Sequence, residues 1–449
     1  MNKRLITLMA AALALLSASG QVSFTSVGEH EPIVINLSDN HTSLNKIYVV
    51  YDTEGVGMTY TATSGDVVHW QTYDSRGGGY PEDVAVRHEG MTTTLDQVIP
   101  NKGYIITEGT TPFYCWVVNY ADYYLELNDL FFNNESPCSL ISFRVDGHAD
   151  AIPYYTIDGR RQILDREIKL TYNTLVWDDS THWQENEVVE TFPALDQSVA
   201  IDPPLCNTEF LMTGDRFLEE WGLEEGAQSD YFYTQAVNCG SSAVQELRGN
   251  NNEKGIDNGL GGSAPVHIVF TGYPTDAVVY RVWEFASDPE FENVTLQFNQ
   301  DELDQTFTEA GTYYVRYRVA NADGTCEYYG ETYTVTVSES ELVCPNIFSP
   351  GSTEGVNDIW KVSYKSLVEF HCWIFNRWGN LVCEFTDPGS GWDGTYHGRL
   401  VDTGVYYYVV TALGSDGVKY KKRGDITILR YKKGEGSGTG TGTIDTGGY

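Results

Sequence analysis

Apolar and polar side chains alternate at every second residue in many short runs of this sequence, and this pattern restricts most of the chain to β-structure. The clearest run is 313–319, where two arginines lie on one face and four other side chains on the opposite face: Tyr313, Val315, Tyr317 and Val319. Gly, Asn and Asp interrupt such runs at short intervals. Helix signals are few, with one modest candidate at 216–225. The sequence therefore predicts an all-β protein.

The segment 265–341 has the signals of one immunoglobulin-like β-sandwich. Residues 321–324, Asn-Ala-Asp-Gly, supply a turn between the run 313–319 and a second alternating run at 332–337. Residues 309–313, Glu-Ala-Gly-Thr-Tyr, resemble the corner of such sandwiches in which a tyrosine hydroxyl bonds back to the backbone. Trp283 is the expected core aromatic residue. The segment resembles the PKD and related immunoglobulin-like modules of bacterial surface proteins.

Two further groups of strand-like runs precede this segment. The group within 21–132 predicts a β-sandwich, and the group within 133–247 predicts a β-rich module with a short helix. Residues 248–264 are crowded with Gly and Asn and have almost no large apolar side chains, so we expect a flexible linker there. At roughly 100–200 residues per domain, a chain of 449 residues has room for these modules and one more.

The charge of the chain is strongly negative and unevenly distributed. The formal net charge is −35, whereas nucleic-acid-binding proteins normally present a basic surface to the phosphates, so no nucleic-acid partner is expected. Residues 1–342 hold 17 basic and 52 acidic side chains, but residues 343–433 hold 11 basic and 9 acidic ones. This contrast marks a boundary between an acidic passenger and a slightly basic C-terminal segment.

The N-terminal residues 1–20 have the pattern of a secretory signal peptide. Lys3 and Arg4 precede an apolar run at 5–16, and small residues follow it, which predicts cleavage before Gln21. The apolar run of about 12 residues is too short to span a bilayer, which needs about 20. No later stretch is apolar enough to span one. We therefore expect export through the inner membrane by the Sec route and a mature chain without a transmembrane segment.

Eight cysteines form an even set, which in an exported chain permits up to four disulfides. Their positions do not fix the connectivity. Cys372 and Cys383 flank a short hairpin, where either a cross-strand disulfide or two buried thiols would fit. None of the cysteines has the spacing of a zinc site.

The most specific signal in the chain is a set of four motifs between residues 344 and 430. They read CPNIFSPGSTEGVNDIW, FHCWIFNRWGNLVCEF, GWDGTYHGRLVDTGVYYYVV and YKKRGDITILR, and the third repeats the tyrosine-corner pattern at Asp402, Gly404 and Tyr406. In this order the motifs resemble the gliding-motility-associated C-terminal domain, the type B sorting domain of the Bacteroidetes type IX secretion system. The expected fold is therefore a series of tandem immunoglobulin-like β-sandwich modules that ends in a β-sandwich sorting domain at 342–432, followed by a disordered tail at 433–449.

The resemblance implies a targeting signal for secretion rather than an enzymatic activity. In the family, this domain directs passage through the outer-membrane translocon and is commonly removed by a surface sortase. The implied partners are therefore the translocon, its type B accessory membrane protein and a sortase. The residues that the family motifs mark for recognition are Arg377, Trp378, Gly379, Trp392, Asp393, Gly394, Lys421, Lys422, Arg423 and Arg430. Alternatively, these residues only fold turns and core, and the basic cluster is a solvated edge that discourages strand pairing.

Two features depart from the family pattern. The first motif usually contains Asn-Gly-Asp-Gly, whereas this chain has Gly-Ser-Thr-Glu-Gly at 351–355, which argues against a cation in that loop. Family members also typically end close to the last strand, whereas a Gly/Thr/Ser-rich tail follows here. The sequence therefore leaves open whether the terminal domain is cleaved or retained.

Sequence motifs of catalysis are absent: the chain has no HExxH, GxSxG or P-loop pattern, and no cofactor is expected. Asp178, Asp179, His182 and Glu185 are clustered enough to suggest a metal site, but flanking tryptophans favour a plain loop between strands.

Three functional hypotheses follow from these patterns. The leading hypothesis is a non-enzymatic adhesion or interaction passenger on an exported protein of the cell surface or outer membrane, or a secreted one. The second is a structural component of the outer-membrane type IX secretion or gliding apparatus. The third is a surface hydrolase of glycans or peptides, because 52 acidic residues supply many chance carboxylate pairs.

Overall fold

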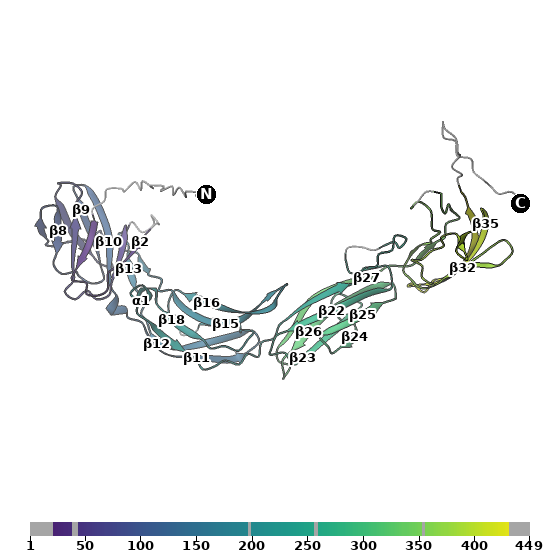
Figure 1. Cartoon of the computed structure of the whole chain (residues 1–449). Helices are drawn as coiled ribbons and strands as arrows, with labels where there is room; N and C mark the ends of the chain where they lie inside the picture. Colours follow the sequence, from purple (N-terminus) through teal and green to yellow (C-terminus); the bar gives the residue numbers. More distant parts are fainter. Residues whose placement is uncertain (1–20, 38–43, 196–198, 256–258, 353–354, 431–449) are drawn as a thin grey trace, which may run out of the picture. The chain divides into compact units, whose positions relative to one another are not determined.

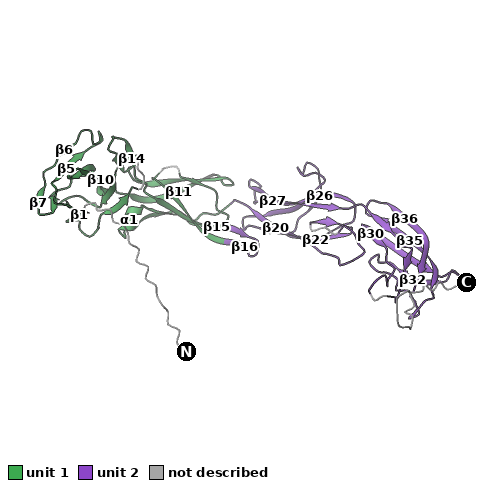
Figure 2. Ribbon diagram, turned by 90° about the horizontal axis from the view of Figure 1, so that it is seen from above, with its two compact units in different colours: residues 1–174, 185–234 green, residues 175–184, 235–449 purple. Residues whose placement is uncertain are grey.

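The computed structural model describes residues 21–37, 44–195, 199–255, 259–352 and 355–430 (Figure 1). Strands dominate these residues and the one α-helix among them is short, which confirms the all-β prediction. The chain divides into two compact units (Figure 2), namely residues 1–174 with 185–234, and residues 175–184 with 235–449. The predicted signal peptide 1–20 and tail 433–449 lie outside the described residues. No helix in the described part is long and apolar enough to cross a bilayer.

The first module of unit 1 is a sandwich of two sheets. Their strand orders are β1-β4-β8-β7 and β2-β3-β10-β9-β5-β6. Met58, Trp70 and Tyr104 are buried between the two sheets. The strands are β1 (Gln21–Thr25), β2 (Ile33–Asn36), β3 (Lys46–Val50), β4 (Gly57–Thr61), β5 (Val68–Tyr73), β6 (Glu82–Asp83), β7 (Arg87–Glu89), β8 (Thr92–Leu95), β9 (Lys102–Glu108) and β10 (Thr111–Asn119).

The second module of unit 1 contains sheets of the orders β11-β12-β17 and β16-β15-β18-β19, with a separate hairpin β13-β14. Its core is continuous with the second face of the six-stranded sheet, because Trp116, Val118 and Phe210 belong to one cluster. The elements are the 3-10 helix η1 (Tyr120–Tyr123), β11 (Glu126–Ser136), β12 (Leu140–His148), β13 (Pro153–Tyr155), β14 (Arg161–Ile163), β15 (Ile168–Asp178), β16 (His182–Phe192), β17 (Ala200–Ile201), β18 (Leu211–Gly214), α1 (Arg216–Glu220) and β19 (Glu225–Gln228).

The predicted helix at 216–225 is shorter in the structure. It begins after Asp215, whose side chain accepts a hydrogen bond from the backbone N–H of Leu218 at 3.1 Å. It ends before Gly222, which has a φ of +71° and turns the chain into strand β19. Asp215 is fully buried and pairs with the buried Arg166 at 2.7 Å, so this cap also holds the module together.

The third module, in unit 2, is a sandwich of the sheets β20-β22-β25 and β21-β27-β26-β23-β24. Trp283 is fully buried in it, as predicted, and the hydroxyl of Tyr313 donates to the carbonyl of Glu309 at 2.9 Å, which confirms the tyrosine corner. Strand β20 lies within the range assigned from sequence to the preceding module. The strands are β20 (Cys239–Gln245), β21 (Gly261–Gly262), β22 (Val266–Pro274), β23 (Tyr280–Ala286), β24 (Val294–Phe298), β25 (Glu302–Phe307), β26 (Gly311–Ala320) and β27 (Glu327–Val337).

The fourth module, also in unit 2, corresponds to the sandwich that the sequence predicts at 342–432. Trp360 and Cys372 are buried in its core, and Cys372 and Cys383 are free thiols rather than a disulfide. The hydroxyl of Tyr406 donates to the carbonyl of Asp402 at 3.1 Å, which confirms the second tyrosine corner. The main sheet has the order β29-β36-β35-β31-β32. The strands are β28 (Glu341–Val343), β29 (Ile347–Phe348), β30 (Ser363–Lys365), β31 (Leu367–Phe375), β32 (Leu381–Phe385), β33 (Thr395–Tyr396), β34 (Arg399–Leu400), β35 (Gly404–Gly414) and β36 (Lys419–Ile428).

Composition predicts a flexible linker at 248–264, but the described residues of this segment, 248–255 and 259–264, make defined contacts within unit 2. Residues 248–255, here called the strap, lie against the fourth module. Nδ2 of Asn252 donates to two backbone carbonyls of that module, at 2.9 and 2.7 Å. Glu253 is buried and pairs with Arg248 at 2.5 Å. Polar side chains hold this segment, which is why a count of apolar residues did not reveal it.

Candidate functional site

Arg377, Trp378 and Gly379, the first predicted recognition motif, form the tip of the hairpin between β31 and β32. Oδ1 of Asn376 fixes the tip by accepting hydrogen bonds from the backbone N–H groups of Trp378 and Asn380, both at 3.0 Å. Gly379 has a φ of +84°, which favours glycine. The Trp378 side chain is 70% exposed, and the Arg377 guanidinium lies 4.3 Å from the centroid of its ring. This exposed pair is available to a partner.

Trp392, Asp393 and Gly394, the second motif, form a turn with structural contacts. Trp392 is only 2% exposed, and its Nε1 donates to the carbonyl of Thr395 at 2.9 Å. Asp393 is exposed, and its Oδ1 accepts bonds from the backbone N–H and the hydroxyl of Thr395. Gly394 has a φ of +76°, and a Cβ there would lie 2.7 Å from Cγ of Pro350. These contacts are those of turn and core residues.

Strand β36 divides the predicted basic cluster between two faces. Lys421 and Arg423 are exposed, whereas Nζ of Lys422 donates to the carbonyl of Leu342 at 2.6 Å. Strand β29 pairs with β36 only at Thr427 and Ile428. Among the described strands, β35 is therefore the one neighbour of residues 419–424, which form a sheet edge with exposed positive charge.

The structure brings three of the predicted groups to one end of the main sheet, namely the tip with Arg377, the turn with Trp392, and Arg430. The tip with Arg377 follows the end of β31, and the ring of Trp392 packs 5.2 Å from that of Tyr406, near the start of β35. Nη2 of Arg430 donates to the carbonyl of Val401, shortly before β35. Burial raises the pKa of Tyr406, and the positive charges of Arg430 and Arg377 act against that rise. The basic residues 421–423 lie further along β36 and do not belong to this end.

A cluster inside the second of the four sequence motifs, whose residues are not among the predicted recognition residues, lies on β31 and β32. The rings of His371 and Trp373 stack with centroids 3.7 Å apart. Oε1 of Glu384 lies 2.6 Å from Nε2 of His371 and accepts a bond from Nε1 of Trp373 at 3.1 Å. The register places Val409 beside Trp373, and Arg423 beside Val409, on the same face of the sheet. The two-residue spacing of His371 and Trp373 is the sequence signal that would have revealed it.

The acidic residues considered for a metal are occupied by hydrogen bonds in the structure. Oδ1 of Asp178 accepts four bonds from residues 180–181, and these hold the pKa of Asp178 well below its usual range. Oδ1 of Asp179 accepts a bond from a tryptophan ring at 2.9 Å, and Oε1 of Glu185 accepts one from Asn173 at 2.7 Å. In the part of the chain that the structure describes, no group of three or more His, Cys, Asp or Glu is arranged to hold a metal ion.

The tip of hairpin β15–β16 belongs to unit 2, where it packs on β20 and β22. The ring of His182 lies between Trp177 and Tyr273, with centroid distances of 5.4 and 3.8 Å. Nε1 of Trp183 donates to the carbonyl of Tyr273 at 2.8 Å. A Cβ on Gly240 would overlap the Trp177 ring, so glycine is required there. The tryptophans therefore anchor the loop.

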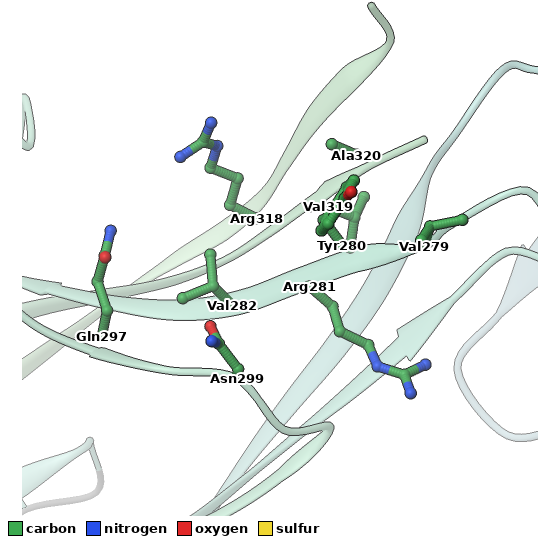
Figure 3. Close-up of a pocket in the computed structure, with 9 residues that line it drawn as sticks. All are labelled: Val279, Tyr280, Arg281, Val282, Gln297, Asn299, Arg318, Val319 and Ala320. Carbon is green, nitrogen blue, oxygen red and sulfur yellow. The ribbon is translucent and has the colours of Figure 1, made fainter. Parts of the chain in front are cut away.

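A groove of about 340 Å³ lies on the third module (Figure 3). Val282 and Arg281, neighbours on β23, point to opposite sides of the strand. Arg318 of β26 is the cross-strand partner of Val282 and lies on its side. The lining residues are Val279, Tyr280, Arg281, Val282, Gln297, Asn299, Arg318, Val319 and Ala320.

Comparison with known proteins identifies two segments. A model of the type IX secretion signal domain matches residues 342–428, and a model of the fibronectin type III domain matches residues 131–229. A search of curated proteins found no match. Among solved structures, the crystal structure of chicken CNTN1 FN1-FN3 domains is 12% identical, with 68% of this chain and 99% of that chain covered and a TM-score of 0.22.

The first of these matches confirms the resemblance drawn from the four motifs between residues 344 and 430. The chain carries a type IX secretion signal domain, preceded by a fibronectin type III domain at the position of the second module. It is therefore delivered by type IX secretion and reaches the cell surface or the medium.

Proposed function

Because a type IX secretion signal follows a fibronectin type III domain in this chain, we propose that its passenger, residues 21–341, is a non-enzymatic array of modules for adhesion or interaction at the cell surface. The order of these two domains is the observation that carries the proposal. In β-sandwich modules the cores are filled by their own side chains, which leaves outer faces and loops to contact other molecules. The strong negative charge of the passenger favours neutral or cationic partners over anionic ones.

The proposed route begins with Sec export and cleavage before Gln21. The translocon and its type B accessory membrane protein then recognise the sorting domain at the end of the sheet that carries Arg377 and Trp378. The 70% exposure of Trp378 supports this choice, because exposed aromatic residues beside arginine are typical anchors of protein interfaces. A sortase acts on the chain after passage.

Deletion of the gene and its complementation test this proposal. Cells with the full chain are expected to expose the passenger to added protease and to adhere to surfaces, and cells without it to adhere less. A complemented strain that lacks residues 342–449 should keep the passenger inside the cell. Unchanged adhesion after deletion would contradict the adhesive function, and hydrolysis of glycans or peptides by the purified chain would contradict its non-enzymatic nature.

A second candidate function, a retained component of the secretion or gliding apparatus, is favoured by the strap. Its side-chain and backbone bonds attach the fourth module to the third within unit 2, as the pairing of Lys254 N–H with the Tyr364 carbonyl at 2.8 Å illustrates. Mass spectrometry of the surface-associated protein distinguishes the candidates. Peptides from residues 345–430 in the mature form would support retention, and their absence would support a cleaved passenger.

A further inference from the structure

We propose that the groove on the third module binds a neutral saccharide. The proposal rests on the adhesive function above and assigns a ligand class to one surface of the passenger. The groove is formed on the outer face of the sheet, opposite the buried Trp283 and Tyr317. Its volume of about 340 Å³ lies within the range of small-ligand sites, about 300–1,000 Å³.

The lining combines an apolar floor with an exposed aromatic rim. Tyr280 is the cross-strand partner of Ala320, and Val282 follows on the same face of β23. Both residues line the groove, where Ala320 is buried and the Tyr280 ring is 59% exposed. A tyrosine ring offers an apolar surface and a hydroxyl together, which suits the apolar C–H face and the hydroxyl groups of a pyranose.

The positive charge of Arg318, which lies on the groove side of the sheet, is already neutralised by the protein. Arg318 bonds to Glu284 at 3.3 Å and to Glu327 at 2.5 Å. The Arg281 side chain points to the other side of β23, away from Val282, and pairs there with Asp301 at 3.2 Å. An anionic ligand would therefore meet no free positive charge and would also be repelled by the acidic passenger. These pairs favour an uncharged ligand.

Two amide side chains give the groove both donors and acceptors. Nε2 of Gln297 donates one bond to Glu284 at 3.2 Å, and the rest of its amide has no hydrogen-bond partner among the described residues. Asn299 is exposed and makes no side-chain hydrogen bond among the described residues. Each amide can donate and accept, as the hydroxyl groups of a saccharide require.

A buried ion network holds these groups in place before any ligand binds. The Glu284 side chain is 4% exposed and accepts two bonds from Arg316, at 2.9 and 2.8 Å. The guanidinium of Arg316 lies between the rings of Phe291 and Tyr329, 3.9 and 4.3 Å from their centroids. Glu284 in turn fixes Arg318, which lines the groove. A site that is already ordered loses less conformational entropy on binding.

The test uses the full mature chain on an array of neutral oligosaccharides and matched sialylated or uronate-containing ones, followed by calorimetric titration with the strongest neutral binder. We expect binding to neutral saccharides and at least a tenfold loss of affinity in Tyr280→Ala and in Asn299→Ala. Tyr328→Ala is the matched control, because Tyr328 is 40% exposed and does not line the groove. All three variants should keep the melting temperature. Absence of saccharide binding, a preference for anionic glycans, or unchanged affinity in both variants would overturn the proposal.

Adhesion of cells that carry the same variants separates this proposal from the proposed function. If adhesion depends on the chain but not on Tyr280 or Asn299, the adhesive function stands and the groove is not its binding site. If the variants lose saccharide binding in titration while deletion of the whole chain leaves adhesion unchanged, the groove stands as a saccharide site and the adhesive function is wrong.

Discussion

Trp378 and Trp392 both lie in turns of the sorting domain but have opposite environments. Trp392 is 2% exposed and Trp378 is 70% exposed. Trp392→Ala should therefore destabilise the module by about 3–5 kcal/mol through lost packing. Trp378→Ala should change stability by less than about 0.5 kcal/mol but reduce the amount of passenger on the surface. Denaturant unfolding and surface labelling measure the two effects, and normal export of a folded Trp378→Ala chain would contradict its recognition role.

Gly379 and Gly394 form a second matched pair, because both adopt positive φ angles. Gly379→Ala should cost about 1–2 kcal/mol for the left-handed backbone alone, since a Cβ at this position would have no other atom within 4 Å. Gly394→Ala should cost about 1–3 kcal/mol more, because a Cβ there would lie 2.7 Å from Cγ of Pro350. Unfolding free energies of the two variants test the difference. Equal losses would show that crowding at Gly394 has no energetic effect.

Glu108 makes the first module sensitive to acid. Burial raises the pKa of its carboxyl, but hydrogen bonds from Ser64, Tyr60 and Thr63 lower this pKa by more than burial raises it. The net result is a pKa of about 2, compared with an ordinary value of 4.5. The folded chain therefore binds fewer protons here than the unfolded chain, and the stabilisation is present above pH 4.5 and is lost as the pH falls toward 2. The melting temperature should fall less between pH 5 and pH 2.5 in Glu108→Gln than in the wild type. Parallel pH profiles would contradict this assignment.

At the scale of elements, tyrosine corners fix the starts of β26 and β35. Tyr313→Phe removes the bond from its hydroxyl to the Glu309 carbonyl and should destabilise unit 2 by about 1 kcal/mol. The neighbouring Tyr314 provides the control, because its hydroxyl has no hydrogen bond among the described residues. Tyr314→Phe should be close to neutral. Denaturant midpoints compare the variants, and an equal effect of both would show that the corner bond is not the source.

The sequence predicts local elements well because their signals are local. The alternation at 313–319 and the corner residue Tyr406 determine strands and turns without distant partners, and the structure confirms both. The environments of Trp378 and Trp392 could not be distinguished, because each lies in a Gly-containing turn and burial depends on residues far along the chain. The contacts of the strap were not predicted either, because asparagine and glycine indicate a loop but not the residues that the loop contacts.

At the scale of the whole chain, we expect the strap to make the third and fourth modules unfold as one cooperative body. Nδ2 of Asn252 donates to the carbonyls of Val362 and Pro388 at 2.9 and 2.7 Å, so Asn252→Ala leaves two carbonyls without this donor. The loss should cost about 1–3 kcal/mol and separate one melting transition of unit 2 into two. Asn251→Ala is the control, because Asn251 is exposed next to it.

Calorimetry of the wild type and both variants measures the transitions, and hydrogen exchange along β30 and β31 shows which module opens first. Two transitions in the wild type would mean that the strap does not couple the modules, and one transition in Asn252→Ala would place the coupling in other contacts.

A single transition in the wild type has a functional consequence. Cleavage of the backbone between the modules would then leave the sorting domain bound through the strap, so release of the passenger requires the strap to open as well.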